Sequence, residues 1–250
     1  MLRRFFVDGS IEPDQPCIIT GSEARHILKV LRMGPGDRLV IMDGRGARFQ
    51  AVIQSATRQE VTVIPERPLP QPPPSAVEII LCQALLKSGP MDYLVQKTSE
   101  LGVDAIFPFF SERTIVHLEE GRFANRLRHW SEISRSAVKQ SGRIAPARIA
   151  APSSLEEVTA KWKAEKGLKA MLWEGEGKGD LKTLLRDSSR TEKFIGIIGP
   201  EGGFAGEEVE MAKGAGFIPV SLGNRILRSE TAAVTLVAVV QYEWGDLGFQ

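Results

Sequence analysis

The segment Phe194-Ile-Gly-Ile-Ile-Gly-Pro-Glu-Gly-Gly-Phe204, followed by Gly206-Glu-Glu208, joins an apolar run to a glycine-rich turn and a polar helical start. A short apolar run that ends in turn residues is typical of a buried strand. Glycine and proline at 199–203 stop that strand, and acidic residues favour the first turn of a helix. The segment therefore predicts a strand, a tight turn and a helix in succession.

The same alternation extends in both directions from this segment. Further strands are expected at Val77–Cys82, Ala105–Phe109, Ala170–Trp173 and Pro219–Leu222. Helices are expected near 91–101, 123–140, 154–165, 206–215 and 230–243, where apolar residues recur at helical spacing. Alternating strands and helices indicate an α/β domain whose largely parallel sheet is covered by helices on both faces.

The N-terminal part has a different pattern. Residues 65–74 hold six of the fifteen prolines and are expected to be neither helix interior nor central strand. Before them, short alternating runs and one helix near Ser22–Leu31 predict a small β-barrel of a size suited to binding. The runs are Cys17–Thr20, Arg38–Met42, Arg48–Ile53 and Val61–Ile64. We therefore expect a barrel over 1–67, a linker over 68–74 and an α/β domain over 75–250.

Composition restricts the class of protein. The chain has 250 residues, 42% hydrophobic and 25% charged, with a formal net charge of +1, as in ordinary globular proteins. Bulk charge therefore gives no affinity for nucleic acid. Two cysteines and three histidines (Cys17, Cys82, His26, His117, His129) lack ligand spacing, so no metal site is expected. The start of the chain has no signal peptide and Ala232–Val240 is too short to cross a membrane, so we expect a cytoplasmic protein without membrane contact.

Three loops follow predicted strands at 172–177, 199–204 and 222–231. In open α/β sheets, ligands bind beyond the carboxyl ends of the strands, so these loops are the candidate site. Each has a structural alternative: the second is also a tight turn before a helix, and Gly175, Gly177 and Gly179 also suit a surface loop. In the third loop Ser229 can cap the last helix, and Glu230 can pair with Arg225 or Arg228. The chain has no phosphate-binding G-x-x-x-x-G-K-[ST] motif.

Basic residues are concentrated between Arg113 and Arg148, a segment that contains eight positive and three acidic side chains. Such a run is either a solvated helix face or a surface for phosphates. Candidate phosphate contacts in this run are Arg113, Arg135, Lys139 and Arg143. Candidates in the small barrel are Arg3, Arg4, Arg25, Lys29 and Arg32.

Several motifs together resemble one family, the RsmE family of bacterial 16S rRNA (uracil N3) methyltransferases, in the SPOUT class. The resemblance covers essentially the whole chain. Its most specific parts are Ile198-Gly-Pro-Glu-Gly-Gly-Phe204 and Leu222-Gly-Asn-Arg-Ile-Leu-Arg-Ser-Glu-Thr-Ala232. Weaker parts are Arg3-Arg-Phe-Phe-Val7, His26-Ile-Leu-Lys-Val-Leu-Arg32, Gln96-Lys-Thr-Ser-Glu-Leu-Gly-Val103 and Lys139-Gln-Ser-Gly-Arg143.

The resemblance implies a PUA-like RNA-binding barrel, an α/β domain with a trefoil knot, and a homodimer. It implies S-adenosylmethionine as cofactor and 16S rRNA, or the small ribosomal subunit, as partner. By the same resemblance Lys97 joins the candidate RNA contacts. The implied cofactor residues are Leu172, Trp173, Glu174, Gly199, Pro200, Glu201, Gly202, Leu222, Gly223, Ile226, Leu227, Thr231 and Ala232.

The implied chemistry needs no metal, because the sulfonium of S-adenosylmethionine already activates the methyl group. The protein must align that group with the uracil nitrogen and help remove the imide proton. Arg225 and Arg228 are candidates for stabilising the uracil anion, and either Glu230 or Glu201 for accepting the proton. Two alternatives stay open: a non-catalytic RNA-binding or ribosome-assembly protein, and an enzyme that binds a nucleotide at the Gly199 loop.

Overall fold

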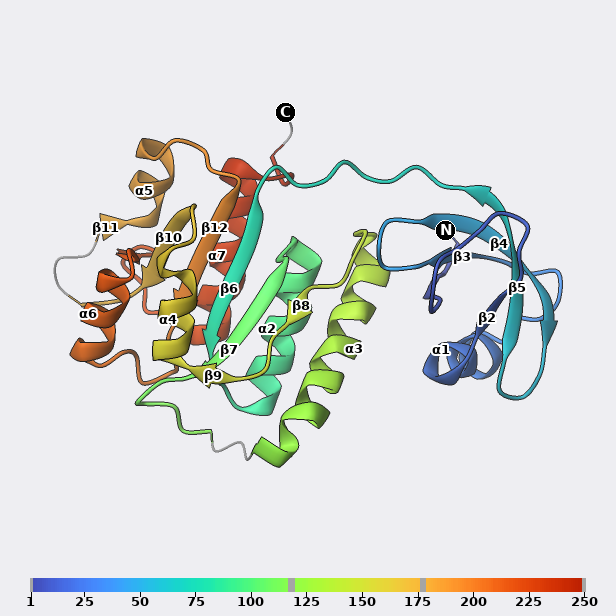
Figure 1. The fold of residues 1–250 in the computed structure, drawn as a ribbon, viewed down its shortest axis with the longest axis horizontal. Helices are drawn as coiled ribbons and strands as arrows, with labels where there is room; N and C mark the ends of the chain where they lie inside the picture. The colour runs from blue at the N-terminus through green and yellow to red at the C-terminus, as the bar shows by residue number, and fades with distance from the viewer. Residues whose placement is uncertain (1, 117–119, 176–178, 249–250) are drawn as a thin grey trace. The chain divides into compact units, whose positions relative to one another are not determined.

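The computed structural model describes residues 2–116, 120–175 and 179–248, and it divides into two compact units (Figure 1). The first unit comprises residues 1–73 and 138–145. The second comprises residues 74–137 and 146–250. The sequence pattern placed all of 75–250 in one domain, so the assignment of 138–145 differs.

The first unit is built on a five-stranded sheet. Its strands are β1 (Arg4–Phe6), β2 (Cys17–Ile19), β3 (Arg38–Met42), β4 (Arg48–Ala56) and β5 (Val61–Pro68). They lie in the order β1-β3-β4-β5-β2, antiparallel except for β1 beside β3. Within the described residues this order leaves β1 and β2 as two edges, so the sheet is open where the sequence predicted a barrel. Strand β1 was not among the runs predicted from the sequence.

Alternate residues of this sheet form the core of the first unit. Ala51 and Ile53 of β4 and Val61 and Val63 of β5 are buried in one cluster, as a period of two requires. The helix expected over 22–31 is instead a short α1 (Gly21–Arg25) that continues as a π-helix, η1 (His26–Val30).

Strand β5 continues into the proline-rich segment. The expectation that 65–74 contains no central strand is confirmed, but β5 extends beyond the predicted run 61–64, because Pro65 and Pro68 lie opposite Ala51 and Phe49 of β4. The neighbour on the other side, β2, pairs only with residues 61–63. Beyond that point β5 is an edge strand, where proline's missing N–H leaves no partner unsatisfied.

Residues 138–145 belong to the first unit through both apolar and polar contacts. Val138 packs with Phe6, Val40 and Met42. Arg4 donates hydrogen bonds from Nη1 to the main-chain oxygens of residues 139 and 140, at 2.8 and 3.2 Å. A helix pattern in the sequence does not reveal such contacts, because they join residues about a hundred or more positions apart.

The second unit has a parallel sheet, as the alternation predicted. Its strands are β6 (Glu78–Ala84), β7 (Ala105–Phe110), β8 (Arg148–Ile149), β9 (Ser153–Ser154), β10 (Leu168–Leu172), β11 (Gly179–Asp180), β12 (Lys193–Ile198) and β13 (Ile218–Ser221). They lie in the order β11-β13-β10-β12-β6-β7-β8, and β9 also pairs with β7. Strand β12 therefore lies between β10 and β6, although both precede it in the chain.

Helices cover both faces of this sheet, which confirms the layered arrangement. They are α2 (Ser88–Leu101), α3 (Phe123–Ser141), α4 (Leu155–Lys163), α5 (Leu181–Asp187), α6 (Gly206–Gly214) and α7 (Ser229–Trp244); a short 3-10 helix, η2 (Glu120–Arg122), precedes α3. Side chains of α2, α5 and α7 pack in one cluster, and those of α4 and α6 in another. The sequence did not predict α5, which is only seven residues long.

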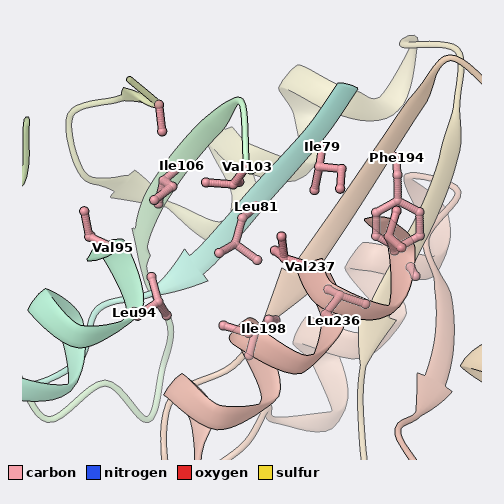
Figure 2. Close-up of a cluster of buried hydrophobic side chains, with 14 of the residues drawn as sticks. Ile79, Leu81, Leu94, Val95, Val103, Ile106, Phe194, Ile198, Leu236 and Val237 are labelled. Carbon is pink, nitrogen blue, oxygen red and sulfur yellow. The ribbon is translucent and has the colours of Figure 1, made fainter. Parts of the chain in front are cut away.

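Strand β6 shows how both faces are filled. Ile79 and Leu81 lie in the cluster with α2 and α7, and Figure 2 shows Leu81 between Leu94 of α2 and Val237 of α7. Ile80 and Cys82 lie in the cluster with α4 and α6. A strand buried on both faces is apolar at nearly every position, which explains the continuous run in the sequence.

Both cysteines are free thiols, and Cys82 is buried, which raises the pKa of its thiol. In the described part of the chain, every helix is too short or too polar to span a bilayer.

Candidate functional site

One cavity of about 670 Å³ lies in the second unit, where three loops leave adjacent strands. Strands β13, β10 and β12 are neighbours and run parallel, so their carboxyl ends open at the same edge of the sheet. The loops that follow them are the three that the sequence singled out. The lining comprises Arg113, Leu172–Gly175, Ile198–Glu201, Gly203, Phe204, Val220–Ser229 and Ala232.

The loop after β10 is shaped by an aromatic ring. The main-chain N–H of Trp173 donates to the carbonyl of Val220, which joins the loop to β13 at 3.0 Å. A β-carbon at Gly175 would lie 2.0 Å from the Trp173 ring. Glycine at 175 is therefore required for the ring to lie against the loop. Residues 176–178, and with them Gly177, lie outside the described part of the chain.

The loop after β12 is a tight turn that also lines the cavity. The N–H of Gly203 donates to the carbonyl of Pro200 at 3.0 Å. The ring of Phe204 folds back over Gly199, where a β-carbon would lie 2.9 Å from it. Phe204 is buried and stacks on Phe109 of β7. The structural and the ligand-binding interpretations of this loop are thus compatible.

The loop after β13 leads directly into α7. Gly223 has a left-handed φ of +114°, which favours glycine. The expectation that Ser229 caps α7 is wrong, because the N-cap is Arg228 and Ser229 is the first helical residue. The Ser229 hydroxyl donates to the Gly199 carbonyl at 2.6 Å and accepts from the buried side chain of Gln83 at 2.9 Å. Ser229 thus connects the loop after β12 to the start of α7.

Most of the residues proposed for the cofactor line this cavity, and three of the four proposed for catalysis do so as well. Arg225, Arg228 and Glu201 are among the lining residues, whereas Gly202, Thr231 and Glu230 are not. For all of these residues, inside and outside the lining, the role at the site stays a prediction. Ile226, at the tip of the last loop, is 84% exposed.

The ion pair suggested for Glu230 is not formed. Across the described residues, no salt bridge or hydrogen bond joins Glu230 to Arg225 or Arg228. Both arginines are exposed at the cavity. Their guanidinium groups are therefore available to a ligand rather than being used to hold the loop.

Arg113 reaches the cavity from a fourth strand. It follows β7, and its Nη1 donates to the Gly202 carbonyl at 3.1 Å. A β-carbon at Gly202 would lie 3.2 Å from Arg113 Cβ, so this glycine faces Arg113. The sequence indicated Arg113 only as an RNA contact. Its position after a predicted strand could have suggested the cavity, since the carboxyl ends of parallel strands share one edge.

The predicted RNA contacts differ in their surroundings. Arg3, Arg25, Lys29 and Arg32 are exposed in the first unit. Lys139 forms an ion pair with Glu23 at 2.7 Å, and Arg4 bonds the end of α3. Lys97 pairs with Glu100 of its own helix at 3.0 Å. Arg135 and Arg143 each interact with other residues.

Metal-ligating side chains do not cluster in the described part of the chain, where no three His, Cys, Asp or Glu residues come together. His129 instead pairs with Asp92 at 2.9 Å. His117 lies outside the described residues.

Comparisons with known proteins agree with this arrangement. Residues 73–241 match the RNA methyltransferase domain family, and residues 19–66 match the RNA methyltransferase PUA domain family. The chain is 25% identical over 254 residues to the ribosomal RNA small subunit methyltransferase E of Bacillus subtilis, with 97% of each protein covered.

Two solved structures are similar over nearly their full length. A protein from Legionella pneumophila, solved with its bound cofactor S-adenosylmethionine, is 33% identical with a TM-score of 0.92, covering 99% of this chain and 100% of that one. The ribosomal RNA small subunit methyltransferase E of Neisseria gonorrhoeae, solved with S-adenosyl methionine, is 31% identical with a TM-score of 0.90, covering 98% and 99%. The chain belongs to the ribosomal RNA small subunit methyltransferase E family of RNA methyltransferases.

Proposed function

We propose that this protein transfers the methyl group of S-adenosylmethionine to N3 of a uridine in 16S rRNA. The observation that carries the proposal is the cavity formed by the loops after β10, β12 and β13, with two arginines at its edge that the described residues leave unpaired. The family and the solved relatives that hold S-adenosylmethionine support the same conclusion.

The residues that line the cavity suit this cofactor. A cavity of about 670 Å³ falls within the usual range for a ligand of this size. Apolar side chains such as Leu172, Leu222 and Leu227 can enclose an adenine ring, and the turning loops present main-chain N–H and C=O groups for its edges. When bound, the cofactor supplies a methyl group on a positively charged sulfur, which the carboxylates of Glu174 and Glu201 complement in charge.

The chain's own residues then have two tasks. The loops hold the two reactants in line, so that the uracil nitrogen meets the methyl carbon without a large entropic cost. Arg225 and Arg228 donate hydrogen bonds to the uracil oxygens, which become more negative as the N3 proton leaves. Donors held in place before the reaction lower the barrier because they need no reorganisation during it.

Of the two carboxylates considered as proton acceptor, we favour Glu201. It lines the cavity, whereas Glu230 lies in the first turn of α7 outside the lining. A general base must come within hydrogen-bond reach of the proton that it removes. Glu201 from this position would accept the N3 proton.

The test is a methylation assay with purified protein, labelled S-adenosylmethionine, and either free 16S rRNA or small ribosomal subunits. Digestion to nucleosides and mass spectrometry should find the label on N3 of uridine. Binding of the donor without transfer to either RNA would favour the non-catalytic RNA-binding protein. Binding of ATP in its place would favour the nucleotide-binding enzyme.

Finer features of the proposal come from the family resemblance. We propose that the segment from β12 to α7 is threaded as a trefoil knot, and the position of β12 between β10 and β6 supports this. We also propose a PUA-like role in RNA binding for the first unit, a homodimer, and a cytoplasmic location where ribosomal subunits are made. Light scattering tests the dimer, since a monomeric mass at assay concentration would contradict it.

A further inference from the structure

Glu208 is a buried carboxylate that joins two loops near the cavity. It is only 8% exposed and lies in the first turn of α6. Its Oε2 accepts hydrogen bonds from the Ser111 hydroxyl at 3.1 Å and from the Ala205 N–H at 2.9 Å. Its Oε1 accepts from the N–H of Glu112 at 3.0 Å. One side chain therefore ties the loop after β7 to the loop after β12.

The hydrogen bonds of Glu208 hold the residues that precede Arg113. Ser111 is 7% exposed, and the turn from Ser111 to Thr114 is closed by two hydrogen bonds of 2.9 Å between these residues. Arg113 lies inside this closed turn, and its guanidinium reaches the Gly202 carbonyl and the cavity. The Glu208 carboxylate thus holds the start of the turn that carries Arg113 next to the loop after β12.

Helix capping alone does not explain these bonds. The bond from the Ala205 N–H is the kind that an N3 glutamate makes at many helix starts. The bonds from Ser111 and Glu112 come from a segment nearly a hundred residues earlier. Glu157 offers a direct comparison, because it is the N3 residue of α4 and accepts from the Ser154 N–H at 2.9 Å, but it is exposed and joins no cavity loop.

We infer that Glu208 is a positioning residue for methyl donor binding, acting by holding Arg113 and the loop from Gly199 to Phe204 at the cavity. This inference rests on the proposed function, since it names the reactant whose binding Glu208 controls. The donor is the reactant, because the cavity at which Arg113 lies is enclosed by the same loops that would hold it.

Substitution of Glu208 by Gln tests the inference while keeping size and shape. The three donors all require an acceptor, yet a glutamine offers only one oxygen. In one orientation of the amide, its NH₂ group meets the N–H of Glu112; in the other orientation, it meets the N–H of Ala205. Either way, one main-chain donor loses its acceptor. We expect Glu208→Gln to raise the Kd for S-adenosylmethionine about tenfold, measured by calorimetry.

The matched control is Glu157→Gln, which alters the same kind of capping bond and should leave the Kd unchanged. Ser111→Ala is a milder variant that removes only one of the three bonds, and it should raise the Kd about threefold. It keeps the inference testable if Glu208→Gln does not fold. An unchanged Kd for the folded Glu208→Gln variant, or for Ser111→Ala, would overturn the inference.

A coupling measurement separates positioning from general loss of stability. If Glu208 acts through Arg113, Glu208→Gln should weaken donor binding much less in an Arg113→Ala background than in the wild type. Fully additive effects would overturn the inference, as would an unchanged donor Kd together with a raised KM for RNA. Wild-type protein that binds no donor at all would instead overturn the proposed function together with this inference.

Discussion

The end of α3 and the last loop before α7 both carry positive side chains, but the protein uses them differently. In the first unit, Lys139 is paired with Glu23 and Arg4 bonds the last carbonyls of α3. At the cavity of the second unit, Arg225 and Arg228 form no such bonds with the described residues. The first two cations are used in contacts within the fold, whereas no contact with the described residues occupies the second two.

This difference shows that a basic residue in a sequence motif can serve either purpose. Lys139 lies in a motif that resembles the family, as the loop at 222–232 does. Only its partner, more than a hundred residues away, identifies its structural role. The following predictions test whether the two sets of cations are as distinct as their contacts indicate.

The largest effect is expected from Arg228→Ala. Removing a donor that stabilises a developing charge typically lowers the rate by about 10²-fold or more. We expect that loss in the single-turnover rate at saturating donor and RNA, with little change in melting temperature. Arg186→Ala, which removes an exposed arginine of α5, serves as the control. A normal rate for Arg228→Ala would make this arginine non-catalytic.

Lys139→Met should affect stability instead. The pair with Glu23 is largely shielded from solvent, and the other carboxylate oxygen of Glu23 is already without a partner. Loss of the lysine leaves the carboxylate unpaired, which should cost about 1–3 kcal/mol of unfolding free energy in denaturant titrations.

The double variant Lys139→Met with Glu23→Gln should recover part of that loss, because the remaining charge is gone. Donor affinity should stay at the wild-type value in both variants. If Lys139→Met leaves stability unchanged and weakens RNA binding, Lys139 belongs with the ligand-binding cations.

Gly223→Ala tests the backbone of the last loop. A left-handed φ strains an alanine by about 1 kcal/mol or more, although a β-carbon there meets nothing within 4 Å. We expect the donor Kd to rise about fivefold as the loop shifts. Gly216→Ala is the matched control, because Gly216 has a φ of +87° outside the cavity. Equal donor affinity in the two variants would show that the loop at 223 does not shape the site.

The smallest effect is expected from Lys29→Gln combined with Arg32→Gln. Both side chains are exposed in the first unit. Removing a phosphate contact should reduce the log–log salt slope of RNA binding by about 0.7 to 0.9 for each cation replaced. Donor affinity should not change. A slope equal to that of the wild type would exclude both residues from the RNA surface.

Local patterns predicted most of the second unit. The strands β6, β7, β10, β12 and β13 are apolar runs, and the long helices show helical spacing, so their type was clear. Because the carboxyl ends of parallel strands share one edge, the three loops of the cavity followed from the same patterns. The short helix α5 and the short strands lacked enough residues for any period to show.

What the sequence missed depends on contacts between distant residues. Glu208 looks like an ordinary helix-start glutamate, and its bonds to Ser111 and Glu112 leave no local pattern. The hydrogen bond between Ser229 and Gln83 was missed for the same reason. A serine before an apolar helix is typical of a cap, and nothing near it in the sequence points to Gln83. The proline-rich segment holds no central strand, as predicted, but β5 extends into it as far as Pro68, because proline is excluded only where a neighbouring strand needs its N–H.

The position of β12 has a consequence for how the chain folds during synthesis. Strand β12 pairs with β6, where Lys193 lies opposite Glu78, and with β10, where Phe194 lies opposite Leu168. One edge of β6 and one edge of β10 are therefore unpaired until β12 has been made. Until then both strands present unpaired N–H and C=O groups, which are prone to pair with other chains. Pairing over such long sequence separations is also slow. We therefore expect nascent chains that end before residue 193 to aggregate more readily than chains that end after residue 198.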